Sequence, residues 1–418
     1  LPLSEQEAAW AFAANDCCTI YYMTHTAAER DLPELLPLID EQARAASDRM
    51  NITFSQPITI TLLPRVLGHG GFASSEIHVS YLDRNYTDGQ LGNILQHEMV
   101  HILDTRLGGD LRPDLLVEGL AVYATGGHYQ PGPLMPQAAT LLDTWGDPPQ
   151  PGLDRYLPLR ALADDFYSAQ HEIGYLQAGA LVDYMVRTWG WSGFSAFYRD
   201  IHPHLSGSQA QALEDALLAH FDLSLAQLEQ DFITALRQQP ASPALLEELQ
   251  LTITYYDTLR AYQQQLDPSA YFRHAWLLDT PTMRQKNILA DYLRHPLEAS
   301  NLALEALLIT AGEELRRGEY PQARNTLETV RHVLQAIERE DPSPFASQPL
   351  AAEYLALVQA VLENPAFSLD YELQRLQVEN ETARVWISNS TAELFEIEFV
   401  NTENRWQLLT PVPTGESG

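Results

Sequence analysis

The chain has 418 residues, which is enough for two or three domains with at least one sizeable core. No apolar run reaches the ~18–20 residues that a membrane-spanning helix needs, so we expect no membrane span. The formal net charge of −31 predicts an acidic surface that repels phosphate groups, so nucleic acids and anionic membranes are poor partners.

The N-terminal segment contains the only two cysteines, Cys17 and Cys18, beside a strand-like run at residues 18–23. Adjacent cysteines cannot close a long loop, and they lack the spacing of a zinc ribbon. We expect a structural pair of thiols, and the alternative is a strained disulfide between neighbours.

Strand and helix patterns then alternate along the chain. Residues 27–50 have the pattern of an amphipathic helix, whereas residues 57–63 and 76–82 have strand patterns. A helix is expected from about Asp88, as its N-cap, to residue 107 before two glycines. The next helix begins near Pro113 and ends at a second glycine pair.

The remaining chain is first helical and then rich in β patterns. Four helices are expected before a boundary at residues 240–243: residues 171–189, 192–201, 208–220 and 224–239. A helical pair at residues 303–317 and 320–337 resembles a tetratricopeptide hairpin, without a clear 34-residue repeat. Alternating runs after residue 366 predict a small antiparallel sheet. We therefore predict an α+β fold divided into residues 1–240, a helical domain at 241–365 and a β-rich module at 366–418.

The motif His97-Glu98-Met99-Val100-His101 lies on the helix expected to end at residue 107. Each helical residue turns the chain by ~100°, so His97 and His101 lie on one face, about one turn apart. Two imidazoles placed in this way can bind one zinc ion. Glu98 projects beside them, which suits a general base that takes a proton from water.

A catalytic zinc ion needs a third protein ligand, and Glu118 is the best candidate. Sixteen residues separate Glu118 from His101, enough for one helix to end and the next to return. Glu118 interrupts an otherwise apolar stretch, where an unpaired carboxylate is unfavourable. The alternative is a solvated glutamate at the edge of a helix.

The two motifs His97-Glu98-x-x-His101 and Glu118-Gly119-Leu120-Ala121-x-Tyr123 together resemble the gluzincin metallopeptidases. The resemblance covers about residues 15–238 and is nearest to the peptidase MA-like group, with aminopeptidase N and thermolysin more distant. It implies a thermolysin-like domain of a small mixed sheet, two zinc helices and a helical lobe. It also implies that His97, His101 and Glu118 bind Zn²⁺ and that Glu98 is the base.

The sequence departs from the aminopeptidase pattern in two respects. The interval between His101 and Glu118 is shorter than in that family, and no G-x-M-E-N segment precedes the zinc helix; the corresponding residues begin at Gly71. Since that segment anchors a free amino terminus, aminopeptidase specificity is not supported.

Several further residues are candidates for roles around the metal. In the resembling families a tyrosine on a later helix reaches the transition state, and Tyr175 takes that role here, the alternative being a core tyrosine at the cleft wall. Tyr123 lies ~140° round its helix from Glu118. It is interpreted either as a residue that packs in the core or as one that supports a metal ligand without binding the metal. Asp104 could orient a ligand imidazole, and the alternative is an ordinary carboxylate on the helix surface. His171 could line the cleft, and the strand around residues 77–80 could pair with a peptide substrate.

The leading hypothesis is a zinc-dependent peptidase that acts on peptides or proteins. The alternative is a binding or scaffold protein, in which the metallopeptidase domain is ancillary and the helical region contacts a protein partner. A hydrolase of another substrate is the third hypothesis, because fold and ligands do not define the pocket. Four Asn-x-Ser/Thr sequons and the absence of an initial Met are compatible with an extracytoplasmic or secreted protein.

Overall fold

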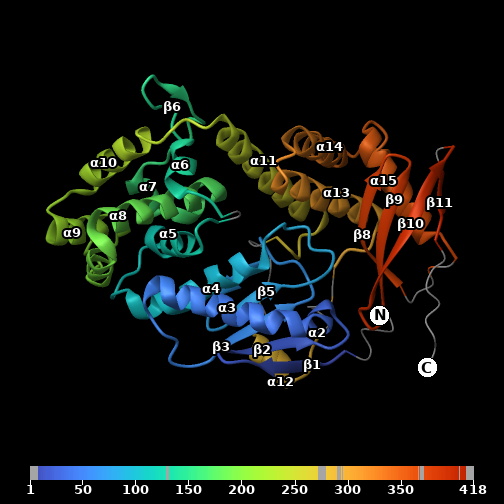
Figure 1. Ribbon diagram of the computed structural model, residues 1–418, viewed down its shortest axis with the longest axis horizontal. Helices are drawn as coiled ribbons and strands as arrows, with labels where there is room; N and C mark the ends of the chain where they lie inside the picture. The colour runs from blue at the N-terminus through green and yellow to red at the C-terminus, as the bar shows by residue number, and fades with distance from the viewer. Residues whose placement is uncertain are drawn as a thin grey trace.

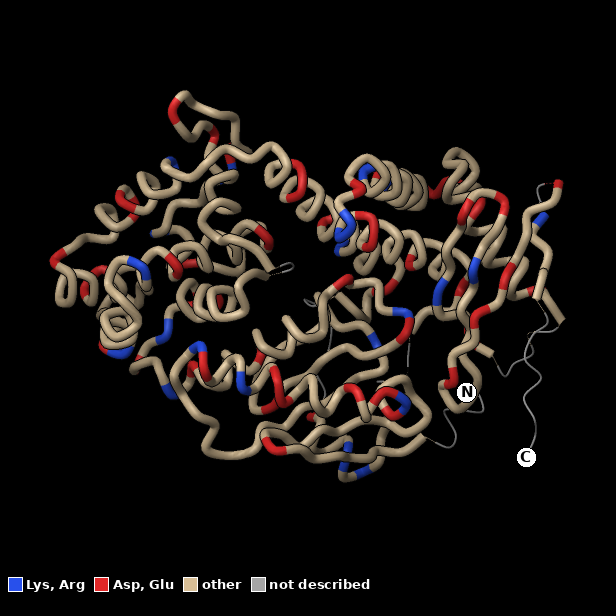
Figure 2. Tube along the Cα trace, in the orientation of Figure 1, with Lys and Arg blue, Asp and Glu red and all other residues tan. Residues whose placement is uncertain are grey.

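The computed structural model describes residues 8–128, 131–271, 279–289, 293, 295–365, 367, 371–403 and 405–410. These residues form a mixed sheet with flanking helices, a helical lobe, a second helical region and a C-terminal antiparallel sheet (Figure 1). Among them, no helix has the length and apolar character needed to cross a membrane. Figure 2 shows that acidic residues are spread over all of these parts.

The first sheet has five strands in the order β1-β2-β3-β5-β4. Their bounds are β1 (Trp10–Ala14), β2 (Cys18–Met23), β3 (Ile58–Leu63), β4 (Gly71–Ala73) and β5 (Ile77–Ser80). The three inner strands are parallel, and both outer strands are antiparallel to their neighbours. The inner strands are the three that were predicted. The short edge strands β1 and β4 were not predicted.

Four helices accompany this sheet: two lie between β2 and β3 in the chain, and two follow β5. They are α2 (Ala27–Arg30), α3 (Leu32–Met50), α4 (Leu91–Leu107) and α5 (Asp114–Thr125). The predicted N-cap at Asp88 is wrong, because α4 begins after Gln90 and Asp88 has a positive φ of 59°. Asp88 instead pairs with Arg316 of the second helical region. The end of α5 matches the prediction, since Gly126 takes the left-handed conformation that favours glycine.

The two adjacent cysteines form a disulfide between Cys17 and Cys18. The expectation of two thiols is therefore wrong. Cys18 begins β2 and is buried, so the bond lies at the start of a core strand.

The helical lobe contains α6 (Leu134–Ala139), α7 (Leu159–Asp164), the 3-10 turn η1 (Phe166–Ser168), α8 (His171–Arg199), α9 (Gln209–Phe221) and α10 (Leu225–Arg237). A two-stranded ribbon, β6 (Thr144–Trp145) and β7 (Gln150–Pro151), lies between α6 and α7. The expected break in α8 occurs at Gly190, where φ is 72°. The capping signal at Ser224 is confirmed, because its side chain accepts a hydrogen bond from the backbone of Gln227.

Helices α5 and α8 pack closely at Gly119. A Cβ atom at this position would lie 2.6 Å from the backbone oxygen of Ala178 on α8. This oxygen belongs to a helix backbone and cannot move aside alone. Gly119 therefore sets the separation of the helix that carries Glu118 from the helix that carries Tyr175.

Replacing Gly119 with alanine is expected to lower the free energy of unfolding by about 1–3 kcal/mol, since overpacking outweighs the gain in helix propensity. Urea denaturation followed by tryptophan fluorescence measures the change. Gly92→Ala is the matched control, because its Cβ would meet side-chain atoms alone, the nearest being the amide nitrogen of Gln42 at 3.4 Å. Equal stability of the two variants would contradict the close packing.

The second helical region contains α11 (Pro243–Leu266), α12 (Thr280–Gln285), α13 (Ala299–Arg316), α14 (Tyr320–Glu338) and α15 (Pro349–Leu362). Helices α13 and α14 form the predicted hairpin, which turns at Gly318 with a φ of 72°. The C-terminal sheet has the order β11-β10-β9-β8, from β8 (Tyr371–Glu379), β9 (Thr382–Asn389), β10 (Leu394–Thr402) and β11 (Arg405–Leu408). Other parts of the predicted 366–418 module, such as residues 411–418, lie outside the described residues.

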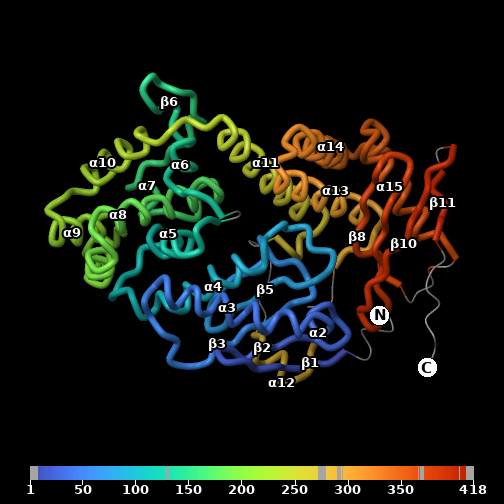
Figure 3. Tube along the Cα trace, in the orientation of Figure 1, coloured from blue at the N-terminus to red at the C-terminus, as the bar shows by residue number. Residues whose placement is uncertain are grey.

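The predicted boundary at residues 240–243 precedes α11, but α11 remains tied to the first half of the chain (Figure 3). Tyr86 donates a hydrogen bond to Asp267 at 2.6 Å, and Tyr255 donates one to the backbone oxygen of Tyr86 at 2.7 Å. Tyr86 and Val66 are buried in the same apolar cluster as α11, α13 and α14. Helix α11 is therefore held against the loops that precede α4.

Candidate metal centre

Helices α4 and α5 bring His97, His101 and Glu118 together, as the sequence predicts. The Oε2 atom of Glu118 lies 3.4 Å from Nε2 of His97 and 3.3 Å from Nε2 of His101. One ligand atom from each residue lies within 4.8 Å of the others, so this group could hold one metal ion. The pairing of residues i and i+4 on α4 supplies the two imidazoles, and the neighbouring helix α5 supplies the carboxylate.

The packing around the cluster explains why these side chains are held in place. On α4, the residues between and beside the histidines, such as Met99, Val100 and Leu103, are fully buried in the core. On α5, Glu118 is 7% exposed within a helix whose other residues are mainly apolar. The buried faces of the two helices therefore orient the three polar groups toward each other.

The electrostatics of the cluster fit a bound cation. Burial alone would raise the pKa of Glu118, but the two imidazoles, His101 above all, hold it well below its usual range. Burial alone would lower the pKa of His101, but the charge of Glu118 outweighs it and raises this pKa to about 9. The negative charge of Glu118 therefore stabilises a positive charge next to the Nε2 atoms of the two imidazoles. Oε2 of Glu118 is also buried without a hydrogen-bond partner among the described residues, as a metal-ligand oxygen would be.

Tyr167 fixes the other oxygen of Glu118. Its hydroxyl donates a hydrogen bond of 2.8 Å to Oε1, which leaves Oε2 on the side of the two histidines. Such a partner orients a ligand carboxylate. Sequence reasoning missed Tyr167, which lies in the turn η1 and has no fixed spacing to either motif.

Glu98 lies beside the cluster in the predicted position of the base. It is 7% exposed and lines the same cavities as His97. Burial raises the pKa of Glu98, while the neighbouring imidazoles and a hydrogen bond from the backbone of Ala73 oppose the rise. The strand β4 therefore contacts the carboxylate that faces the cleft.

Three cavities share the side chains of Tyr167 and Tyr175, and two of them also include residues of the cluster. The central cavity of about 360 Å³ includes Leu67, Phe72, Ile94, His97 and Glu98. The α5-side cavity of about 450 Å³ includes Ser74, His101, Thr105, Arg112 and Glu118. The α11-side cavity of about 430 Å³ includes Gln170, His171, Asp257, Arg260 and Tyr271. These volumes lie in the range of ligand sites, ~300–1,000 Å³.

Tyr175 lies in the wall of the cleft, where it lines the same cavities as His97 and Glu98. Its ring is buried, and its centroid lies 6.2 Å from that of His97. Burial and the charge of Glu118 raise the pKa of Tyr175 well above its usual value, so its hydroxyl stays protonated and can donate. The imidazoles of His128 and His171 stack on this ring, with centroids 4.2 and 4.1 Å away.

His171 does line the cleft, and His128 and His69 accompany it there. The Nε2 atoms of His128 and His171 lie 3.2 Å apart. Burial lowers the pKa of both residues well below the usual range, and it lowers the pKa of His69 to about 4. These imidazoles are therefore neutral at pH 7. His78 lies apart from them and bonds to Thr280.

Asp104 and Tyr123 each contact an arginine. Asp104 is fully buried but accepts a hydrogen bond from Arg112 at 2.7 Å, and Nδ1 of His101 has no hydrogen-bond partner among the described residues. Asp104 therefore does not orient a ligand imidazole by direct contact. Tyr123 packs under the guanidinium of Arg49, 4.2 Å from the ring centroid, which agrees with its interpretation as a packing residue.

The prediction that the strand at residues 77–80 pairs with a substrate is also wrong. Residues 77–80 form β5, which lies between β3 and β4 and is paired on both sides. The edge strand of the sheet next to the cleft is β4, whose residues line the central and α5-side cavities.

Protein-family models, curated proteins and solved structures were compared with the chain, and none matches it.

Proposed function

We propose that this protein is a zinc-dependent metallopeptidase. The observation that carries the proposal is the convergence of His97, His101 and Glu118 beside a buried Glu98, where two cavities adjoin. Two imidazoles and one carboxylate form the protein ligand set of a catalytic zinc site. The adjacent open cavity leaves room for the water or substrate that takes the fourth position.

The proposed fold is a thermolysin-like gluzincin domain of the peptidase MA-like kind. Three features support it: the edge strand β4 borders the cleft, the two ligand helices follow it, and a helical lobe carries Tyr175. Among the described residues β4 is the outermost strand on this side of the sheet, and its outer edge suits pairing with an extended peptide backbone.

In the proposed reaction, zinc would polarise the substrate carbonyl and lower the pKa of a nearby water. Glu98 accepts the proton of that water and delivers it to the leaving amine. Tyr175 donates a hydrogen bond to the carbonyl oxygen as negative charge develops on it. Tyr167 holds Glu118 in place through Oε1.

We also propose an extracytoplasmic or secreted location. The disulfide between Cys17 and Cys18 supports this, because disulfides persist mainly in oxidising compartments.

Reversible metal dependence tests the proposed function. Purified protein loaded with one equivalent of zinc is expected to hydrolyse an unfolded protein such as casein. A chelator should abolish the hydrolysis, and added zinc should restore it. Equal hydrolysis by the zinc-loaded and metal-free protein would contradict the proposal.

A further inference from the structure

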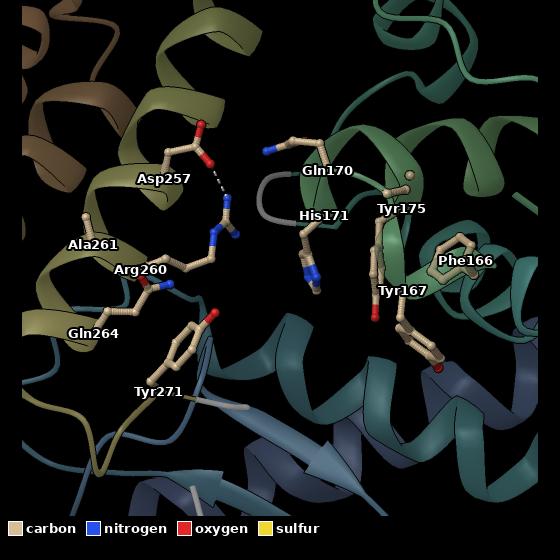
Figure 4. Close-up of a pocket in the computed structure, with 12 residues that line it drawn as sticks. Phe166, Tyr167, Gln170, His171, Tyr175, Asp257, Arg260, Ala261, Gln264 and Tyr271 are labelled. Atoms are coloured by element: carbon tan, nitrogen blue, oxygen red, sulfur yellow. Dashed lines mark hydrogen bonds and ion pairs between the residues drawn. The ribbon is translucent and has the colours of Figure 1, made fainter. Parts of the chain in front are cut away.

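One wall of the α11-side cavity comes from a helix beyond the predicted domain boundary. Arg260 and Gln264 of α11 line one side of this cavity. Figure 4 shows that His171 and Tyr175 of α8 line the other side. Tyr175 also lines the central and α5-side cavities. The helix α11 therefore shares a cavity with the proposed donor to the substrate carbonyl.

Arg260 forms a two-pronged ion pair with Glu172, the second residue of α8. Its Nη1 atom lies 2.8 Å from Oε1 of Glu172, and its Nη2 atom lies 2.8 Å from Oε2. Two parallel bonds fix both the separation and the mutual orientation of the planar groups. Glu172 is only 2% exposed, and a buried carboxylate requires charged or polar partners. The ion pair therefore holds the first turn of α8 against α11.

The first turn of α8 carries the residues that face the cleft. His171 immediately precedes Glu172, and Tyr175 follows one helical turn later, with ring centroids 4.1 Å apart for His171 and Tyr175. Gln170 caps the helix by accepting a hydrogen bond from the backbone of Ile173, and its amide group donates one to Glu172. Because these residues belong to one helical turn, a shift of Glu172 displaces Tyr175 as well.

Helix α11 is itself held in place by contacts other than this ion pair. The buried side chain of Gln263 donates a hydrogen bond of 2.9 Å to the backbone oxygen of Gly68. The backbone nitrogen of Gly68 donates one of 2.8 Å to the oxygen of Ala270, which follows α11. Asp257 of α11 also contacts the guanidinium of Arg260, at 2.7 Å. Arg260 therefore projects from a fixed helix in a fixed orientation.

We propose that Arg260 is a positioning residue of the active site. Through Glu172 it holds the first turn of α8, so that the hydroxyl of Tyr175 reaches the substrate carbonyl. The inference rests on the proposed peptidase function and adds to it a residue of the second helical region. It also gives α11 a role other than the recognition of a separate partner, because α11 completes the active site.

Arg260→Lys tests the role of the two-pronged ion pair. Lysine keeps a positive charge beside Glu172, but an ammonium group cannot form two parallel bonds in one plane. In zinc-loaded protein, kcat for a quenched peptide should fall by about tenfold and KM should stay within about twofold, since only the transition state loses a well-placed donor. A rise in KM at constant kcat would overturn the inference, because Arg260 would then contact the substrate itself.

Two further variants support this test. Glu172→Gln weakens the same ion pair by removing the buried charge, and it should lower kcat to a similar extent. Arg324→Lys is the matched control, because it makes the same change in an exposed ion pair of 2.7 Å with Glu247 of α11. The control should keep both kinetic constants. Full activity of Glu172→Gln, or an equal loss in Arg324→Lys, would overturn the inference.

The same change in a Tyr175→Phe background shows whether the effect passes through Tyr175. Without the hydroxyl there is no donor to misplace, so Arg260→Lys should lower the remaining kcat by less than about twofold. An equal fall in kcat in both backgrounds would overturn the inference, because the loss would then arise from a general disturbance of the fold.

A spectroscopic measurement separates this inference from the proposed function. With 3-fluorotyrosine at position 175, the fluorine resonance of the zinc-loaded protein reports the surroundings of that ring without reference to activity. Arg260→Lys should move the resonance, and Arg324→Lys should leave it in place. An unmoved resonance in Arg260→Lys would overturn the inference whatever the activity. A moved resonance in a protein without zinc-dependent hydrolysis would support the positioning of Tyr175 and contradict the proposed function.

Discussion

Replacing Glu98 with glutamine is expected to lower kcat for peptide hydrolysis by about 10²–10⁴-fold, the contribution typical of a general base. Glutamine keeps the shape of the side chain but cannot accept the proton. Because Glu98 is not a proposed ligand, zinc should remain bound at one equivalent. Steady-state kinetics on a quenched peptide and metal analysis of the same samples measure both quantities.

The control for this variant is Glu41→Gln, which makes the same chemical change at an exposed position on α3. It should retain full activity. If Glu98→Gln bound zinc and hydrolysed the peptide at the rate of the unmodified protein, Glu98 would not be the base.

The second large effect is expected at Glu118. Glu118→Gln removes the negative charge that faces both imidazoles, so the affinity for zinc should fall by more than the ~10–100-fold typical for loss of a residue that only supports a ligand. Competition with a zinc-binding dye measures the affinity without reference to activity.

Tyr167→Phe provides the comparison for Glu118→Gln. It removes only the hydrogen bond to Oε1, so the affinity should fall by about tenfold. Equal losses in the two variants, or no loss in Glu118→Gln, would contradict the assignment of Glu118 as a ligand.

The convergence of His97, His101 and Glu118 could be predicted because local geometry determines most of it. The positions of His97 and His101 follow from helical periodicity, and an isolated carboxylate in the apolar stretch around Glu118 requires a partner. The glycine signals after α4 and α5 also predict where each of these helices ends.

The remainder of the cleft depends on contacts between distant parts of the chain. Tyr167 reaches Glu118 from a turn, and Arg260 reaches Glu172 from a helix on the far side of the predicted boundary. Neither residue has a spacing that marks its role. The short edge strand β4 also lacks a pattern of its own, because three residues cannot show alternation.

The errors made from the sequence have related causes. Asp88 has the chemistry of an N-cap, but a long-range ion pair with Arg316 holds it elsewhere. Asp104 lies on the same face of α4 as His97, but its carboxylate forms an ion pair with Arg112. In both cases an arginine outside the helical turn of the carboxylate, Arg316 or Arg112, pairs with it instead of the predicted partner.

The most direct test of the account is a crystal of the zinc-loaded protein measured on either side of the zinc absorption edge. The account predicts one anomalous peak, bordered by Nε2 of His97, Nε2 of His101 and the carboxylate of Glu118. Zinc bound only elsewhere, with no peak between these three side chains, would contradict it.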